Sequence, residues 1–148
     1  MICYLDTSAL VKLYIKENGS EEVLKVVEAS SLVATSKIAY AEARAAFARG
    51  LREKVYNVEA YRLIVDAFRN DWNSYFAIEV SDDILEMAGD AAEKFALCGF
   101  DALHLASASF LTKHNKEEMM VGCWDVRLWQ AYCKAGFSVF PPQSPRET

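Results

Sequence analysis

Short apolar runs alternate with longer amphipathic segments along this chain of 148 residues, and this alternation restricts the possible fold more than any other feature. A short apolar run between turn or capping residues is typical of a buried strand in a parallel sheet. Helices between such strands form βαβ units, which build a sheet with helices on both faces. We therefore predict an α/β protein, a three-layer α/β/α sandwich with a central parallel sheet. The predicted strands are 2–5, 32–34, 76–80, 119–123 and 137–140.

Capping residues and apolar side chains at helical spacing predict the helices between these strands. We expect Thr7 or Ser8 to cap the first helix and Ser81 to cap the fifth. Asp101 is expected to open the sixth helix, after a turn at 97–100 that ends the fifth. The predicted helices are 9–15, 21–29, 37–52, 59–72, 82–96, 102–111 and 126–134.

Length and composition indicate one domain with a core large enough to fold unaided, because 53% of the residues are hydrophobic and 25% are charged. We place this domain at 1–140 and a C-terminal tail at 141–148. No apolar run approaches the ~20 residues that span a bilayer. Asp6 and Lys12 interrupt the amino terminus, which is unlike a signal peptide. We therefore expect a cytoplasmic protein that does not contact a membrane.

The charged residues and cysteines limit the classes of ligand. The four cysteines form no Cys-x-x-Cys pair, which argues against a zinc site. The net charge of −5, from 16 Lys and Arg against 21 Asp and Glu, argues mildly against a general nucleic-acid binder. It does not exclude a nucleic-acid substrate, because carboxylates that hold a divalent cation add negative charge and phosphate contacts can be local.

Four acidic residues, far apart in the sequence, fall at comparable places in the predicted fold. Asp6 ends the first strand and Asp125 follows the fourth. Glu42 lies one to two turns into the helix after the second strand, and Asp101 lies at or just before the start of a helix. In a parallel sheet these positions meet at one edge. Crowded carboxylates are pushed toward protonation unless a cation neutralises them. Because hard oxygen ligands select Mg²⁺ or Mn²⁺ over zinc, the pattern predicts a site for one of these cations.

Each acid also has an ordinary structural interpretation. Asp101 and Asp125 could serve only as N-caps, a role that Asp often fills. Glu42 could be a solvated helix residue, but among its alanine neighbours it would need a partner if it were buried. Arg49 lies two turns further on, on nearly the same face of the helix. His104, one turn after Asp101, fits a packing or hydrogen-bonding role better than that of a ligand.

Four segments resemble the PIN-domain family, in particular its VapC-like toxin ribonucleases of type II toxin–antitoxin systems. They occur in the family's usual order and cover essentially the whole chain: Leu5-Asp6-Thr7-Ser8-Ala9-Leu10-Val11, Ala41-Glu42-Ala43-Arg44, Asp101-Ala102-Leu103-His104-Leu105-Ala106-Ser107-Ala108 and Asp125-Val126-Arg127-Leu128. The segment at Asp101 is the most specific of the four. The chain departs from the family just before Asp125. The family often has a Thr or Ser followed by a variable residue at this place, and this chain has Cys123-Trp124.

The resemblance implies an endoribonuclease that depends on Mg²⁺ or Mn²⁺ and cleaves RNA by metal-activated water. It also implies a homodimer and a cognate antitoxin protein that inserts a segment near the acidic pocket. Either Glu42 or Asp101 would position or deprotonate the attacking water. The expected roles are catalytic for Asp6, Glu42 and Asp101, metal-binding for Asp6, Asp101 and Asp125, and substrate-binding for Ser8 and Arg49, with Arg44 as a further phosphate contact.

The sequence is also compatible with two other functions. The first is a binding or assembly module that keeps the fold without catalysis. The second is a Mg²⁺-dependent phosphatase with an aspartyl nucleophile. Such phosphatases need a second Asp two residues after the first, and this chain has Ser8 at that place.

Overall fold

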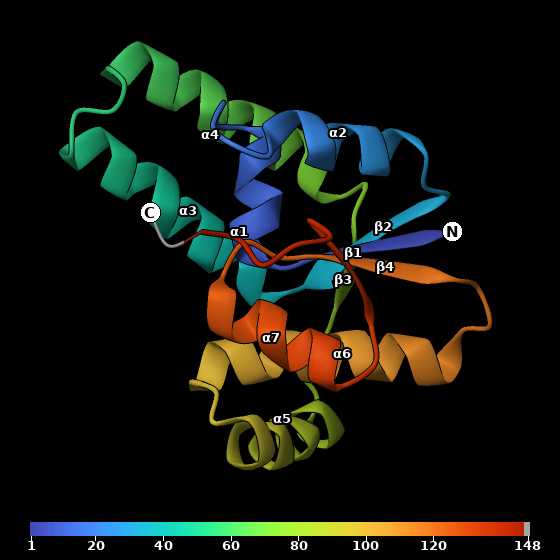
Figure 1. Cartoon of the computed structure of the whole chain (residues 1–148). Coiled ribbons are helices and arrows are strands. Elements are labelled where there is room, and N and C mark those ends of the chain that lie inside the picture. The colour runs from blue at the N-terminus through green and yellow to red at the C-terminus, as the bar shows by residue number, and fades with distance from the viewer. Residues whose placement is uncertain (147–148) are drawn as a thin grey trace.

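The computed structural model describes residues 1–146, and within them a single parallel sheet forms the centre of the protein (Figure 1). The strand order is β3-β2-β1-β4-β5, and each neighbouring pair is parallel. This arrangement confirms the predicted fold class. The strands are β1 (Ile2–Leu5), β2 (Leu32–Ser36), β3 (Phe76–Ile78), β4 (Met119–Gly122) and β5 (Ser138–Phe140).

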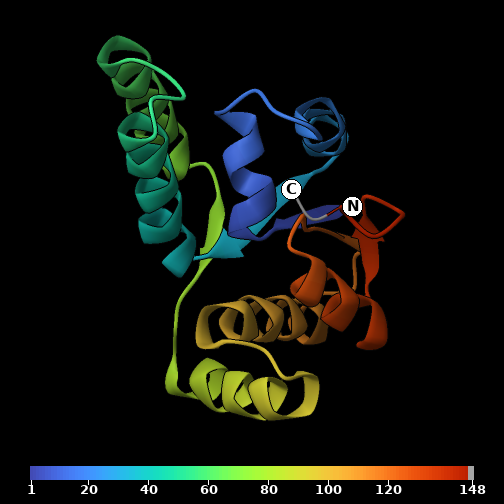
Figure 2. The same cartoon turned by 60° about the vertical axis from the view of Figure 1, so that its left-hand side comes forward.

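Helices cover both faces of the sheet and complete the three layers (Figures 1 and 2). One face carries α1 (Thr7–Leu10) with its 3-10 continuation η1 (Val11–Leu13), α2 (Ser20–Glu28), α3 (Ile38–Arg52) and α4 (Val58–Trp72). The other face carries α5 (Asp82–Phe95), α6 (Gly99–His114) and α7 (Val126–Lys134).

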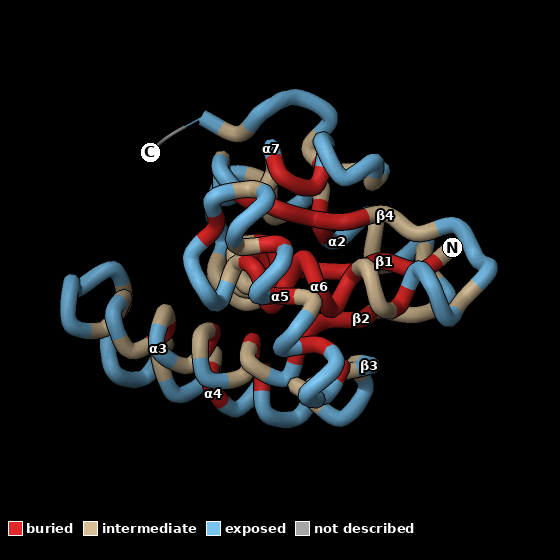
Figure 3. Tube along the Cα trace, turned by 90° about the horizontal axis from the view of Figure 1, so that it is seen from below, coloured by how far each residue is buried: buried red, intermediate tan, exposed pale blue. Residues whose placement is uncertain are grey.

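The alternating side chains of β1 bind these two layers to the sheet. Ile2 and Tyr4 pack into the core under α5, α6 and α7, whereas Cys3 and Leu5 pack into the core under α1 to α4. Because both faces of the strand are covered, its sequence is a continuous apolar run rather than an alternating one. Figure 3 shows buried residues along β1, β4 and α6, in the middle of the molecule.

The direction of winding reverses between β1 and β4. The connection from β1 to β2 crosses one face of the sheet, and the connection from β3 to β4 crosses the other. In open α/β sheets, ligands bind outside the carboxyl ends of the strands at such a reversal. A hydrogen bond from the Asp6 backbone N–H to the Gly122 carbonyl, 3.2 Å long, joins the two strand ends there.

Most element boundaries differ from the predictions by one to three residues, and those of α1, α5 and α6 bear on the site. Asp6 itself caps α1, because its side chain accepts the Ala9 N–H, so neither Thr7 nor Ser8 takes that position. The helix α6 begins at Gly99 rather than after Asp101. The left-handed backbone of Ala96, at φ 52°, ends α5 early enough for a new helix to start. By contrast, the predicted cap at Ser81 is confirmed, because its hydroxyl accepts the Ile84 N–H.

Five aromatic rings hold the α3–α4 hairpin against the end of η1. Phe47 on α3 and Phe68 on α4 are fully buried and meet edge to face. Tyr14, just after η1, packs edge to face against both. Tyr40 and Trp72 extend the cluster along the hairpin. This cluster anchors α3, the helix that carries Glu42.

The chain after β5 is still attached to the domain, since the Trp129 indole N–H donates to the Pro141 carbonyl at 3.0 Å. The division at residue 140 stays a prediction, and residues 147 and 148 of the predicted tail lie outside the described part. In residues 1–146, no single helix is long and apolar enough to cross a membrane. Helices α5 and α6 are long and apolar enough only when taken together, and the chain bends by 114° between them.

Candidate active site

The Asp6 carboxylate lies at the carboxyl end of β1 and is almost completely buried, with 2% of its surface exposed. One of its oxygens, Oδ1, accepts the Ser8 hydroxyl at 2.7 Å and the Ala9 N–H at 2.9 Å. Burial raises the pKa of this carboxyl above its ordinary value, and the hydrogen bonds that it accepts only partly oppose the shift. The strand therefore holds a rigid acid that is costly to ionise without a positive partner.

Glu42 approaches the same edge from the first half of α3, and its side chain is 26% exposed. Its Oε1 accepts the Thr7 hydroxyl at 2.7 Å and faces His104 Nε2 at 2.9 Å. Partial burial would raise the pKa of this carboxyl, but the contacts with His104 and Thr7 outweigh burial and lower the pKa. The partners of the partly buried Glu42 are thus His104 and Thr7, and not Arg49 of its own helix.

His104 projects from α6 into the core with 2% of its surface exposed, and it forms hydrogen bonds through both ring nitrogens. Nδ1 lies 2.9 Å from the Tyr4 hydroxyl, and Nε2 contacts both Glu42 and Thr7. The predicted hydrogen-bonding histidine is therefore confirmed. Its link to Tyr4 was not predicted, although a histidine one turn after Asp101 and a tyrosine on β1 were the available signals.

Asp101 and Asp125 lie at the starts of α6 and α7, but only one of them is a cap. Asp125 is exposed and accepts the Leu128 N–H at 3.0 Å, which confirms an N-cap role. Asp101 is half-buried in the first turn of α6 and accepts the Cys98 thiol at 3.1 Å, while Cys98 holds the N-cap position. Burial raises the pKa of the Asp101 carboxyl, and the nearby carboxylates of Asp125 and Glu42 raise it further.

Ser8 links the ends of β1 and β4. Its hydroxyl donates to Asp6 and accepts the Trp124 backbone N–H at 2.8 Å. Next to it, the buried Cys123 thiol donates to the Asp125 carbonyl at 3.3 Å, at the place where the family often has a hydroxyl. Ser8 therefore holds Asp6 in place in this structure, and its predicted contact with substrate stays a prediction.

We expect Ser8→Ala to lower the free energy of unfolding by about 1–2 kcal/mol, because the Trp124 N–H loses its acceptor. Urea denaturation measures this change, with Ser31→Ala as the control. Ser31 also forms hydrogen bonds, but it is exposed at the opposite edge of the sheet. Equal urea midpoints for the two variants would contradict the role of Ser8 as a link between the strands.

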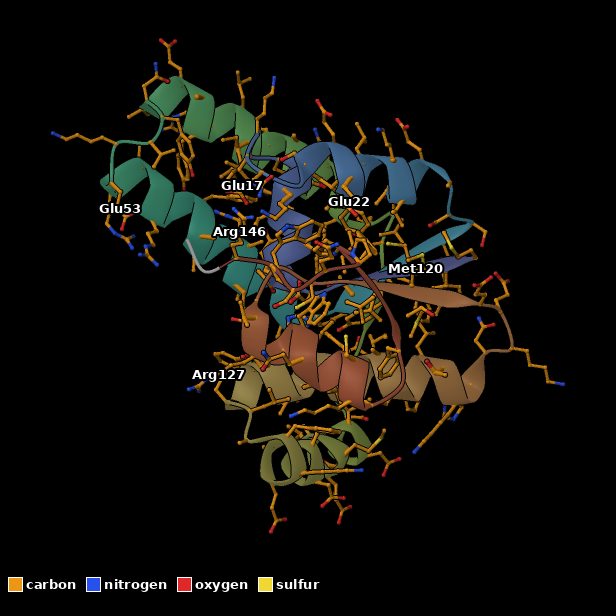
Figure 4. The ribbon with its side chains drawn as sticks, in the orientation of Figure 1. Glu17, Glu22, Glu53, Met120, Arg127 and Arg146 are labelled. Atoms are coloured by element: carbon orange, nitrogen blue, oxygen red, sulfur yellow. The ribbon has the colours of Figure 1, made fainter. Side chains whose placement is uncertain are left out.

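Arg49 does not join the acids. It is 70% exposed, and its Nε donates to Glu53 Oε1 at 2.9 Å. Figure 4 labels Glu53 at the outer end of α3. An exposed ion pair of this kind is weak because solvent screens it, so a phosphate can compete for the guanidinium. Arg44 donates to the Tyr40 hydroxyl at 3.0 Å. Substrate contacts by either arginine stay predictions.

The donors at this edge suit a hard divalent cation in their chemistry. Asp6, Asp101 and Asp125 offer carboxylate oxygens, the ligands that Mg²⁺ and Mn²⁺ prefer. The raised pKa values of Asp6 and Asp101 are those of acids that a nearby cation would stabilise in the charged form. In the conformation described for residues 1–146, no three acidic, histidine or cysteine side chains are close enough together to surround one ion.

A doubly wound sheet with four acids near the carboxyl ends of its strands defines an α/β protein with acidic side chains at the edge where its winding reverses. A model of the PIN domain family matches residues 3–117 of the chain. The chain belongs to the PIN domain family.

Curated relatives and solved structures agree with this assignment. The chain is 34% identical over 146 residues to Ribonuclease VapC45 of Mycobacterium tuberculosis (strain CDC 1551 / Oshkosh) and to Ribonuclease VapC49 of strain ATCC 25618 / H37Rv, covering 96% of each protein and 96% of itself. It superposes on a toxin–antitoxin complex from Klebsiella pneumoniae with a TM-score of 0.67 and on FitAcB from Neisseria gonorrhoeae with 0.68. Each superposition covers 96% of this chain and 98% of the other, at 18% identity, which shows a shared fold.

Proposed function

We propose that this protein is a Mg²⁺- or Mn²⁺-dependent endoribonuclease and the toxin of a toxin–antitoxin pair. The observation that carries the proposal is the position of four acids, Asp6, Glu42, Asp101 and Asp125, around the carboxyl ends of β1 and β4. Support also comes from the 34% identity to two VapC ribonucleases over almost the full length of both chains.

The proposed reaction is hydrolysis of an RNA phosphodiester. The oxygen of a water molecule forms a bond to phosphorus, the bond from phosphorus to one bridging oxygen breaks, and the leaving oxygen takes a proton from solvent. Glu42 takes the proton of the attacking water, because its carboxylate is partly exposed to solvent at the edge of the sheet where the strands end. Asp6 and Asp101 are proposed as metal ligands, because their pKa values are raised and a nearby cation would stabilise their charged forms.

The proposed metal ligands are Asp6, Asp101 and Asp125. A bound divalent cation would supply positive charge to the phosphate oxygens and favour ionisation of water. The protein's own contribution is to hold these acids in register: β1 and the α1 cap fix Asp6, and the α7 cap fixes Asp125. Ser8 and Arg49 are proposed to contact substrate, and Arg49 would do so on the outer side of α3.

The proposed partners are RNA, a cognate antitoxin protein and a second copy of the chain, in the cytoplasm. Two of the structures on which the chain superposes are a toxin–antitoxin complex and a VapBC2 assembly bound to a promoter DNA fragment, which supports the antitoxin as a partner. Light scattering of the purified protein measures the proposed homodimer, and a monomeric mass would contradict it.

Cleavage of total RNA in Mg²⁺ and in excess EDTA tests this function. We expect RNA to be degraded in Mg²⁺ and to stay intact in excess EDTA. Cleavage should return when Mn²⁺ is added. The control variant is Glu117→Gln, which removes an exposed acid beside the amino end of β4 and should leave cleavage unchanged.

Two other results would replace the proposal. No cleavage together with no Mn²⁺ binding in titration would favour a non-catalytic PIN module. A phosphate group trapped on Asp6 would favour the aspartyl phosphatase.

A further inference from the structure

A chain of buried hydrogen bonds runs from the centre of the sheet to Glu42. Tyr4 on β1 is fully buried, and its hydroxyl lies 2.9 Å from His104 Nδ1. On the other side of the ring, His104 Nε2 lies 2.9 Å from Glu42 Oε1. The Tyr4 and His104 rings also pack edge to face at an interplanar angle of 77°. The imidazole is thus held both by packing and by contacts at its two nitrogens.

The partners of the ring determine where its proton lies. An ionised carboxylate only accepts hydrogen bonds, so the contact with Glu42 requires a hydrogen on Nε2. In the neutral ring Nδ1 is then an acceptor, and the Tyr4 hydroxyl can donate to it. A tyrosine hydroxyl keeps its proton at physiological pH because its ordinary pKa is about 10, so Tyr4 remains a donor. Thr7 adds a second donor to the same oxygen of Glu42.

We propose that His104 is a positioning residue, which uses a proton fixed on Nε2 by Tyr4 to hold the Glu42 carboxylate toward the attacking water. This inference rests on the proposed function, in which Glu42 accepts the proton of that water. His104 is only 2% exposed and acts through Glu42. Its contribution is to prevent rotation of Glu42, because an acid held in its reactive orientation lowers the entropic part of the barrier.

Nitrogen-15 NMR of the imidazole tests the proton position without any measurement of activity. With ¹⁵N-labelled protein, the ring resonances of His104 should report a protonated Nε2. His114 is the internal reference, because it is exposed on α6 and its Nδ1 faces the Phe110 carbonyl. An unprotonated Nε2 on His104 would overturn the proposal, even if the protein cleaves RNA.

Kinetics of two substitutions at the same position then separate positioning from packing. For His104→Leu, which removes both hydrogen bonds, we expect kcat to fall about 10- to 100-fold with KM little changed, the range typical of lost supporting contacts. His104→Gln should recover most of that loss, because the Gln amide can donate to Glu42 while its oxygen accepts from Tyr4. Equal kcat values for the two variants would overturn the proposal.

A double-mutant cycle with Tyr4→Phe completes the test. The substitution should lower kcat in the wild-type background but not in His104→Leu, where the hydrogen-bond chain is already broken. Additive effects would mean that Tyr4 acts independently and would contradict the chain. Thermal unfolding of each variant shows that the comparison is made on folded protein. A wild-type protein that cleaves no RNA in Mg²⁺ would instead overturn the proposed function, while the NMR result would stand on its own.

Discussion

Asp6→Asn is expected to reduce RNA cleavage by roughly 10²-fold or more while the protein stays folded and becomes more stable at neutral pH. Cleavage falls because an amide is a poor ligand for the cation that Asp6 is proposed to hold. The fold remains because the Asn oxygen can still accept the Ala9 N–H that caps α1. Loss of the charge removes the cost of a carboxylate that is 98% buried, since only 2% of Asp6 is exposed.

The gain in stability should depend on pH in a defined direction. Burial raises the pKa of Asp6 in the folded protein above its value in the unfolded chain, so the folded state binds the proton more tightly. The stabilisation that comes from this protonation is fully present at acid pH. That contribution is lost as pH rises through the folded-state pKa. The variant, which has no such titration, should therefore match the wild type at low pH and exceed it at pH 7, by about 1 kcal/mol.

Urea denaturation at several pH values measures this difference, and Asp6→Ala is the matched comparison. Alanine also removes the charge, but it removes the helix cap, which costs about 1 kcal/mol. Added Mg²⁺ should raise the Tm of the wild type and leave that of Asp6→Asn unchanged. Full Mg²⁺-dependent cleavage by Asp6→Asn would refute the role of this residue in the site.

Phe47→Ala is expected to cause the largest loss of stability among these variants, about 3–5 kcal/mol. Phe47 is fully buried and meets the rings of Tyr14 and Phe68. Its removal leaves a cavity between α3, α4 and η1 that the surrounding rings cannot close. At about 2–4 °C per kcal/mol for a protein of this size, Tm should fall by roughly 10 °C.

The effect of Phe47→Ala should extend to the site, because the same helix carries Glu42. Cleavage should be lost at a lower temperature than in the wild type, in parallel with the loss of folded protein in a thermal melt. The control is Phe76→Ala on the edge strand β3, where the ring is 50% exposed and little is lost. A similar fall in Tm for both variants would show that the aromatic cluster does not anchor α3.

The fold could be predicted largely from local patterns. A strand covered on both faces must be apolar throughout, so the run from Ile2 to Leu5 was recognisable. The ends of the helices could not be predicted from such patterns, because several neighbouring polar groups can accept the same backbone N–H. Asp6 rather than Ser8 caps α1, since the Ser8 hydroxyl accepts the N–H of Trp124, which lies after β4 and more than a hundred residues away.

The candidate site was predicted as a set of acids, but not as a set of contacts. Parallel strands end at one edge, so Asp6 and Asp125 were placed near each other by topology alone. The partners of Glu42 could not be predicted, because sequence spacing indicates only neighbours on the same helix, such as Arg49. The actual partners, His104 and Thr7, come from other elements that the sheet brings alongside α3.

The sequence by itself determined the α/β class and the four acids, because short apolar runs, helical spacing and residue type are local properties. Only the tertiary structure decided how those acids differ from one another. Burial at the end of β1 raises the pKa of Asp6, while contacts from His104 and Thr7 lower that of Glu42. Such differences depend on which groups meet across the sheet, and solvation and hydrogen bonding at a point in space cannot be read from neighbours in the chain.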